Sequence, residues 1–111
     1  PLAISYQGDA MNVDGDRAAA MIAGAVHAEK LIILTNVVGL MKKFPDEASL
    51  ITHIDKHKVE ASIDFAEGRM KKKVLGASEA LHLGVAQVVF ADGRVEHPIQ
   101  NALAGKGTVI G

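Results

Sequence analysis

Runs of apolar residues show where strands are expected to cross the core of this protein. Residues 31–34 are continuously apolar, and residues 87–90 contain a second such run. Continuous rather than alternating runs are typical of parallel strands that are covered on both faces. Residues 2–5 and 10–13 flank a turn that contains Gly8, and they predict a hairpin. We also expect a strand over residues 108–110.

Helices are expected between these strands. Asp14 can accept hydrogen bonds from the free N–H groups at the start of a helix over about 15–27. Asp55 can do the same for a helix over about 56–63. Pro98 favours the first turn of a short helix that ends near residue 104. Residues 42–52 carry charged and turn-forming side chains and predict an exposed loop.

The longest predicted helix covers about residues 70–83 and ends at Gly84. At 100° per residue, four of its apolar side chains fall on one arc and are expected to be buried: Met70, Val74, Ala77 and Leu81. The order of elements is then hairpin, helix, strand, two helices, strand, helix and strand. This order predicts an α/β protein.

Composition excludes several classes of function. The chain has 111 residues, enough for one domain, and a net charge of −1, which gives no reason to expect a nucleic-acid or membrane-surface binder. No apolar run approaches the roughly 20 residues that span a bilayer. The absence of cysteine excludes disulfides and fits a cytoplasmic protein. Because Pro1 leads directly into a strand without an initiator methionine, we expect a fragment of a longer protein.

Polar side chains gather where the hairpin leads into the first helix. Asn12, Asp14 and Asp16 lie within five residues of one another, ahead of a run of small apolar residues. A functional site could be built at this junction. The alternative is that Asp14 only caps the helix and Asp16 only occupies its first turn.

A basic run begins the helix over 70–83. Three consecutive lysines, residues 71–73, usually form a solvated helix face, and they cannot all point into one pocket. Arg69 and Lys73 are four residues apart and share a side. Lys73 lies about 60° from Met70, at the edge of the apolar stripe. Geometry therefore favours Lys73 as the lysine that reaches inward.

Thr35 and Asn36 follow the apolar run 31–34, and ligands of open α/β sheets gather beyond the carboxyl ends of the strands. Asn36 could equally be a turn residue. Residues 104–108 have the wrong order for a phosphate-binding loop of the Walker type, because their lysine is followed by glycine. His53 and His57 have the spacing of zinc ligands but lack an evident third ligand, so we expect no metal site there.

Four segments in the same order resemble motifs of the amino-acid kinase family, and together they cover nearly the whole chain. Residues 12–19 are similar to its Asn-and-Asp motif followed by two alanines, and residues 34–40 to its nucleotide segment. Residues 68–74 are similar to its segment with Met and Lys three residues apart, and residues 107–110 to its closing Gly-Thr. These motifs resemble those of acetylglutamate kinase and its relatives, and within the family the chain looks most like the branch that phosphorylates 2-aminoadipate or glutamate on an amino-group carrier protein.

The resemblance implies a three-layer α/β/α sandwich with a mainly parallel sheet, of which this chain would be the C-terminal, ATP-binding half. It implies that Asn12 binds the acylated amino-acid substrate, that Asp16 orients catalytic lysines and that Lys73 stabilises the transferring phosphoryl group. The residues implied to bind the nucleotide are Thr35, Asn36, Val37, Gly39, Leu40, Met41, Phe65, Ala66, Glu67 and Met70.

The implied reaction is ATP- and Mg²⁺-dependent formation of an acyl phosphate, in lysine or arginine biosynthesis. The alternatives are an acetylglutamate kinase that acts on free N-acetylglutamate and, from another class, a non-catalytic nucleotide-binding module. The implied partners are an acidic carrier protein, the N-terminal half of the same kinase and further copies of the full-length enzyme. Asn36 stands where the family usually has Asp, and Arg69 where it commonly has Gly. The family's N-terminal lysine and glycine-rich loop have no counterpart here, so this fragment is expected to be inactive alone.

Overall fold

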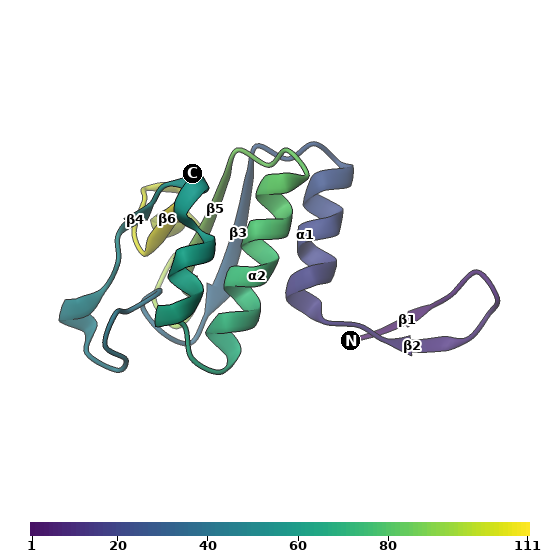
Figure 1. Ribbon diagram of the computed structural model, residues 1–111, viewed down its shortest axis with the longest axis horizontal. Coiled ribbons are helices and arrows are strands. Elements are labelled where there is room, and N and C mark those ends of the chain that lie inside the picture. The colour runs from purple at the N-terminus through teal and green to yellow at the C-terminus, as the bar shows by residue number, and fades with distance from the viewer.

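A four-stranded sheet forms the centre of the protein (Figure 1). The computed structural model describes residues 1–111, except for the side chain of Phe65. The strands lie in the order β3 (Lys30–Thr35), β5 (Gln87–Asp92), β6 (Thr108–Ile110) and β4 (His53–Ile54). β3 is parallel to β5 and β4 is parallel to β6, whereas β5 and β6 are antiparallel. The predicted strands and the mainly parallel sheet are confirmed.

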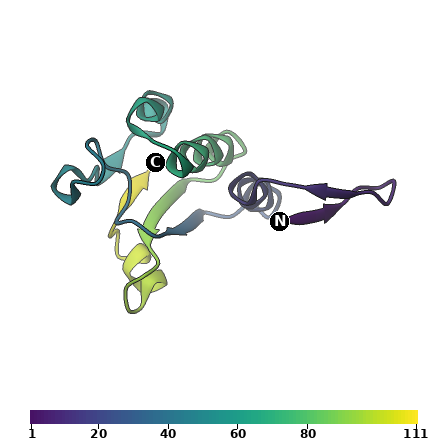
Figure 2. The ribbon, with the colours of Figure 1, turned by 90° about the horizontal axis from the view of Figure 1, so that it is seen from below.

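Helices cover both faces of this sheet (Figure 2). The helices α1 (Gly15–Ala25) and α2 (Arg69–His82) and the 3₁₀ helix η3 (Glu60–Phe65) lie on one face, and α3 (Pro98–Leu103) lies on the other. Side chains of β5 alternate between the two layers, because Phe90 packs in the core under α2 while Ala91 packs with Ala102 of α3. The expected three-layer α/β/α sandwich is confirmed.

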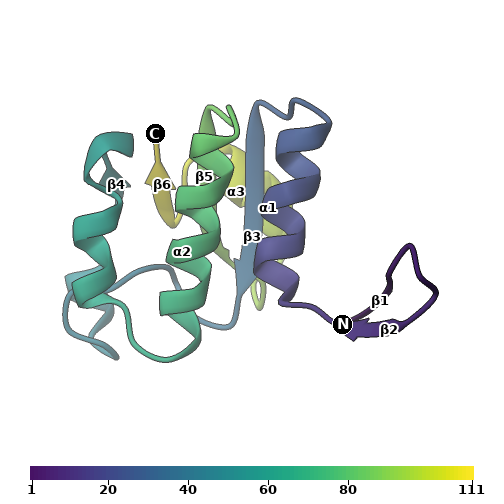
Figure 3. The ribbon, with the colours of Figure 1, turned by 45° about the vertical axis from the view of Figure 1, so that its right-hand side comes forward.

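α1 and α2 run side by side and in the same direction (Figures 1 and 3). Ala20 and Ala23 of α1 and Gly76 and Ala80 of α2 are buried in or beside this contact. A Cβ atom on Gly76 would lie only 3.2 Å from the backbone oxygen of Asp16. Small residues therefore let the two backbones approach closely, and both helices begin at the edge where β3 and β5 end.

The hairpin of β1 (Leu2–Ile4) and β2 (Ala10–Asn12) extends away from the sheet (Figure 3). It gives the molecule its longest dimension, 48 Å. Its apolar side chains remain open to solvent, since Leu2 and Ile4 are each 81% exposed. The predicted hairpin is confirmed.

The prediction of an α-helix over 56–63 is wrong. This region forms two 3₁₀ helices, η2 (Lys56–Lys58) and η3, which are closed by hydrogen bonds between residues three apart. Asp55 does cap η2, since its Oδ1 accepts from the His57 N–H at 2.8 Å. The Ser62 hydroxyl bonds to the carbonyl of Val59. Such local side-chain bonds compete with the α-helical pattern and favour tighter turns.

The loop over 42–52 is exposed as predicted for its first part, which includes the short η1 (Glu47–Ser49). Its last part turns inward. Leu50 pairs with Met41 in an isolated bridge, and the backbone then leads into β4, a two-residue strand that the sequence pattern did not indicate. In the described part of the chain, no helix has both the length and the apolar character needed to cross a membrane.

Candidate functional site

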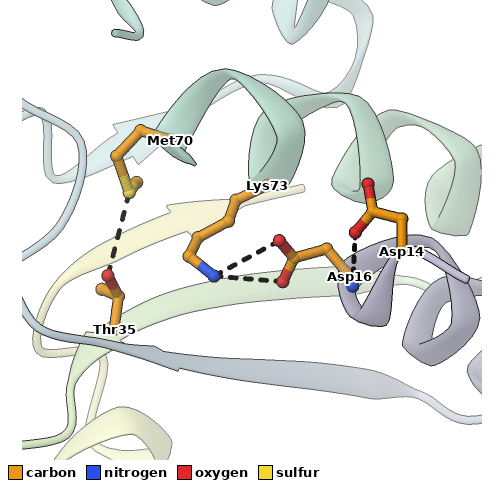
Figure 4. Close-up of polar contacts among 5 residues, drawn as sticks. All are labelled: Asp14, Asp16, Thr35, Met70 and Lys73. Carbon is orange, nitrogen blue, oxygen red and sulfur yellow. Dashed lines mark hydrogen bonds and ion pairs between the residues drawn. The ribbon is translucent and has the colours of Figure 1, made fainter. Parts of the chain in front are cut away.

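An ion pair joins the first turn of α1 to the second turn of α2 (Figure 4). The Lys73 amine, Nζ, lies 3.1 Å from Oδ1 and 3.3 Å from Oδ2 of Asp16, although the two residues are 57 positions apart. Asp14 caps α1, because its Oδ1 accepts from the Asp16 N–H at 3.0 Å. Asp14 therefore performs the capping, and Asp16 is free to hold Lys73.

Both members of this pair are largely withdrawn from solvent. The side chains of Lys73 and Asp16 are 17% and 21% exposed, whereas Lys71 and Lys72 are exposed. The inward orientation expected for Lys73 is thus the one observed. Removal of either member would leave the other as a partly buried charge without a partner, which is far less favourable than the pair.

A cavity of about 600 Å³ opens at the carboxyl edge of the sheet, beside Lys73. It is lined by Leu34, Thr35, Asn36, Val37, Gly39, Leu40, Met41, Phe44, Glu67, Arg69, Met70, Lys73, Gly93 and Arg94. Most of this lining is apolar, but it includes three cationic side chains and one acidic one. Such a cavity suits a ligand with an apolar ring at one part and negative charge at another.

Hydrogen bonds from Thr108 of β6 hold the cavity-lining segment around Leu40 against the sheet. Its buried hydroxyl accepts from the Leu40 N–H at 2.9 Å and donates to the Ile51 carbonyl at 2.6 Å. Gly39 passes close to this hydroxyl, since a Cβ there would lie 2.7 Å from Thr108 Oγ1. On the other side, the Thr35 hydroxyl lies 3.9 Å from the Met70 sulfur, which joins β3 to α2 (Figure 4).

Most residues that the resemblance implied for nucleotide binding line this cavity. Ala66 does not line it but is buried in the core, and the side chain of Phe65 lies outside the described part of the structure. Asp16 does not line the cavity itself, but it contacts Lys73, which does. Asn12 is exposed at the end of β2, on the hairpin, and does not line the cavity.

Five lining residues are not among those that the resemblance implied: Leu34, Phe44, Arg69, Gly93 and Arg94. A signal for the last two was present, because the chain leaves the run 87–90 through Asp92 and Gly93, just as it leaves 31–34 through Thr35 and Asn36. Parallel strands end at the same edge, and the strand-end rule applies to both. Nothing in the local pattern around Phe44 indicates its position.

Asp92 is paired with Arg94 at this same edge. The Arg94 side chain donates from Nε to Oδ1 and from Nη2 to Oδ2, each at 2.9 Å. These bonds hold the pKa of the Asp92 carboxyl below its usual value and raise the pKa of Arg94. Among the described residues, no group of three or more His, Cys, Asp or Glu side chains could hold a metal ion.

The chain is similar to several kinases over almost its whole length. A LysW-aminoadipate kinase of Deinococcus radiodurans is 58% identical over 110 residues, which are 99% of this chain and 38% of that protein. A protein of the same name from Thermus thermophilus is 51% identical over 112 residues (99% and 42%). An acetylglutamate kinase of Clostridioides difficile is 38% identical over 114 residues (98% and 40%). The chain spans about two fifths of the length of these relatives.

Solved structures share the fold. The N-acetylglutamate synthase of Neisseria gonorrhoeae, complexed with coenzyme A and N-acetyl-glutamate, superposes with a TM-score of 0.85 at 30% identity, over 99% of this chain and 26% of that one. The carbamate kinase of Giardia lamblia, bound to AMP-PNP, gives 0.73 at 25% identity, over 99% and 36%. Residues 2–92 match the sequence model of the amino acid kinase family. On this match and on the relatives that are similar across its length, the chain belongs to the amino acid kinase family.

Proposed function

We propose that this chain is the nucleotide-binding, C-terminal portion of a longer kinase. The kinase transfers the γ-phosphoryl group of ATP to the side-chain carboxylate of an acidic amino acid whose amino group is blocked. The observation that carries the proposal is the ion pair of Lys73 and Asp16, because Lys73 also lines the cavity at the carboxyl edge of the sheet. The relatives are named as kinases of LysW-linked aminoadipate or glutamate, which favours 2-aminoadipate or glutamate linked to a carrier protein as the substrate. We place the reaction in lysine or arginine biosynthesis, as the resemblance implies.

The chemistry explains why cations are needed. An oxygen of the substrate carboxylate forms a bond to the γ-phosphorus, the bond from that phosphorus to the bridging oxygen breaks, and ADP leaves. A carboxylate is already ionised at neutral pH, so the reaction needs no general base. The repulsion between the carboxylate and the phosphates opposes the reaction, and fixed positive charge around the transferring group lowers this barrier.

Lys73 is the residue to which we assign this charge. Its amine is held by both oxygens of Asp16, so its position is set before the substrates bind. A charge that is already oriented needs no rearrangement in the transition state. Asp16 thus acts through Lys73 as a positioning residue. Asn12, at the end of the exposed hairpin, is assigned to the acylated amino acid.

The apolar lining and the cationic side chains of the cavity support the assignment of ATP as its ligand. Mg²⁺ would accompany the phosphates of the nucleotide, as this ion commonly does. The carboxylates of Asp16 and Asp92 are engaged by cations, and Glu67 is the acidic side chain that lines the cavity.

The carrier protein is assigned to the exposed start of α2. Lys71 and Lys72 are exposed there, between the cavity-lining Met70 and Lys73 in the sequence, and they would attract an acidic partner. Substitution of both by glutamate in the full-length enzyme is expected to raise KM for carrier-linked substrate. It should leave KM for ATP unchanged.

The central test is turnover of the full-length enzyme with Lys73→Ala. We expect kcat to fall by at least tenfold, which is about 1.4 kcal/mol of barrier. Lys30→Ala is the matched control, since Lys30 is an exposed lysine at the opposite end of β3. Asp16→Asn should reduce kcat similarly with the fold intact. Wild-type turnover in Lys73→Ala would refute the assignment.

The substrate is tested in the same assay. ADP release is measured with carrier-linked 2-aminoadipate, carrier-linked glutamate and free N-acetylglutamate. Faster turnover of the free substrate would favour an acetylglutamate kinase, to which the Clostridioides difficile relative points. Binding of ATP without turnover of any of these substrates would favour a non-catalytic module.

A further inference from the structure

A second cation on the cavity wall is held by its own carboxylate. β5 ends at Asp92, whose partner in the parallel register is Thr35 at the end of β3. Side chains alternate along a strand, so Asp92 lies on the same face as Phe90, the face that α2 covers. Arg94 follows after Gly93 and lines the cavity that Lys73 also lines.

The bonds to Asp92 fix the guanidinium of Arg94. Its Nε and Nη2 both contact the carboxylate at 2.9 Å, and the Arg94 backbone N–H donates to Oδ1 at the same distance. The backbone bond alone would close the turn. The two side-chain bonds add a different effect, because they place the planar guanidinium in one orientation.

Donors remain on this guanidinium. The Nη1 group of Arg94 makes no hydrogen bond within the described part of the chain, and Nη2 uses only one of its two hydrogens on Asp92. The side chain of Arg94 is 56% exposed, whereas that of Asp92 is 15% exposed. The carboxylate is therefore withdrawn from solvent and the free donors of the cation remain accessible at the cavity.

We propose that Arg94 binds the phosphate chain of the nucleotide and that Asp92 is its positioning residue. This inference rests on the proposed function, because it assumes that the cavity takes a nucleotide. Arginine presents several donors in a rigid fork that matches phosphate oxygens. Because Asp92 already orders the side chain, little conformational freedom is lost when the phosphates bind. Lys73 and Arg94 are then two cations on one cavity, each oriented by an aspartate.

The test is calorimetric titration of the full-length protein with ADP and, separately, with adenosine. Arg94→Met removes the donors and keeps much of the side-chain length. We expect it to weaken ADP binding by about 10- to 100-fold, which is the range for hydrogen bonds to charged groups, and to leave adenosine affinity unchanged. Arg94→Lys and Asp92→Asn should give smaller losses for ADP. Arg17→Met is the control, because Arg17 pairs with Glu79 away from the cavity.

The outcomes separate the two proposals. Absence of ADP binding by the wild-type protein overturns both the proposed function and this inference. Wild-type binding with unchanged ADP affinity in Arg94→Met overturns this inference and leaves the function standing. Equal losses for ADP and adenosine would mean that Arg94 contacts the base or ribose, and the phosphate assignment would then be wrong. If Arg94→Met does not fold, as judged by circular dichroism, the ADP and adenosine affinities of Arg94→Lys are compared with those of the wild type instead.

Discussion

Thr108→Val provides a sharp test of how the cavity wall is held. Valine has nearly the same shape as threonine but lacks the hydroxyl that bonds to the Leu40 N–H and the Ile51 carbonyl. Thr108 is 0% exposed and Leu40 is 1% exposed, so water cannot easily replace these bonds. A buried polar group left without a partner costs about 1–3 kcal/mol, and two such groups are affected. We expect the free energy of unfolding to fall by roughly 2–4 kcal/mol.

Thr108→Ser is the matched control for this substitution. It keeps the hydroxyl and removes one methyl group, so the expected loss is only about 1 kcal/mol. Stability is measured by urea unfolding, and ADP affinity by calorimetry. The valine variant should also bind ADP more weakly, because Leu40 lines the cavity, whereas the serine variant should bind it nearly normally. The reasoning would be refuted if serine were as damaging as valine, or if valine left both measurements unchanged.

Three further outcomes are expected. Gly76→Ala should leave the unfolding midpoint in urea nearly unchanged, since the gain in helix propensity offsets the close contact, but it should lower kcat several-fold because the contact is with Asp16. Gly107→Ala should lower the free energy of unfolding by more than about 2 kcal/mol, as its φ is +113° and a Cβ would overlap the Phe90 carbonyl. The pair of Asp92 and Arg94 lowers the carboxyl pKa, so its contribution to stability should be full above about pH 4 and be lost as pH falls through the depressed value. The free energies of unfolding of wild type and Asp92→Asn, measured in urea between pH 2 and pH 7, should therefore become equal at the acid end of this range.

Much of the fold could be predicted from local patterns. The apolar runs that became β3 and β5 are long and continuous, and α2 has a clear stripe and a glycine stop. β4 could not be predicted, because it has only two residues and exists through its pairing with β6. The two 3₁₀ helices were also missed, because the choice between turns of three and four residues depended on side-chain bonds such as that of Ser62.

The candidate site was predictable where helix geometry determines direction. Rotation about the helix axis was sufficient to favour Lys73 among three consecutive lysines. The sequence left open whether Asp16 does more than occupy the first turn of α1, because its contact with Lys73 depends on the packing of α1 against α2. The contribution of Arg94 depended on which strands are neighbours. Only the order of the sheet places the end of β5 beside the end of β3.

The small residues between α1 and α2 have a consequence for mutational screens. The spacing of the two helices sets the distance between Asp16 and Lys73, although neither Ala20 nor Gly76 lines the cavity. A bulkier side chain at such a position would separate the two charged groups while the rest of the protein stayed folded. A library selected for turnover would then score these interhelical positions as if they touched substrate, and only a separate measurement of abundance and of ligand affinity would reveal that they act from a distance.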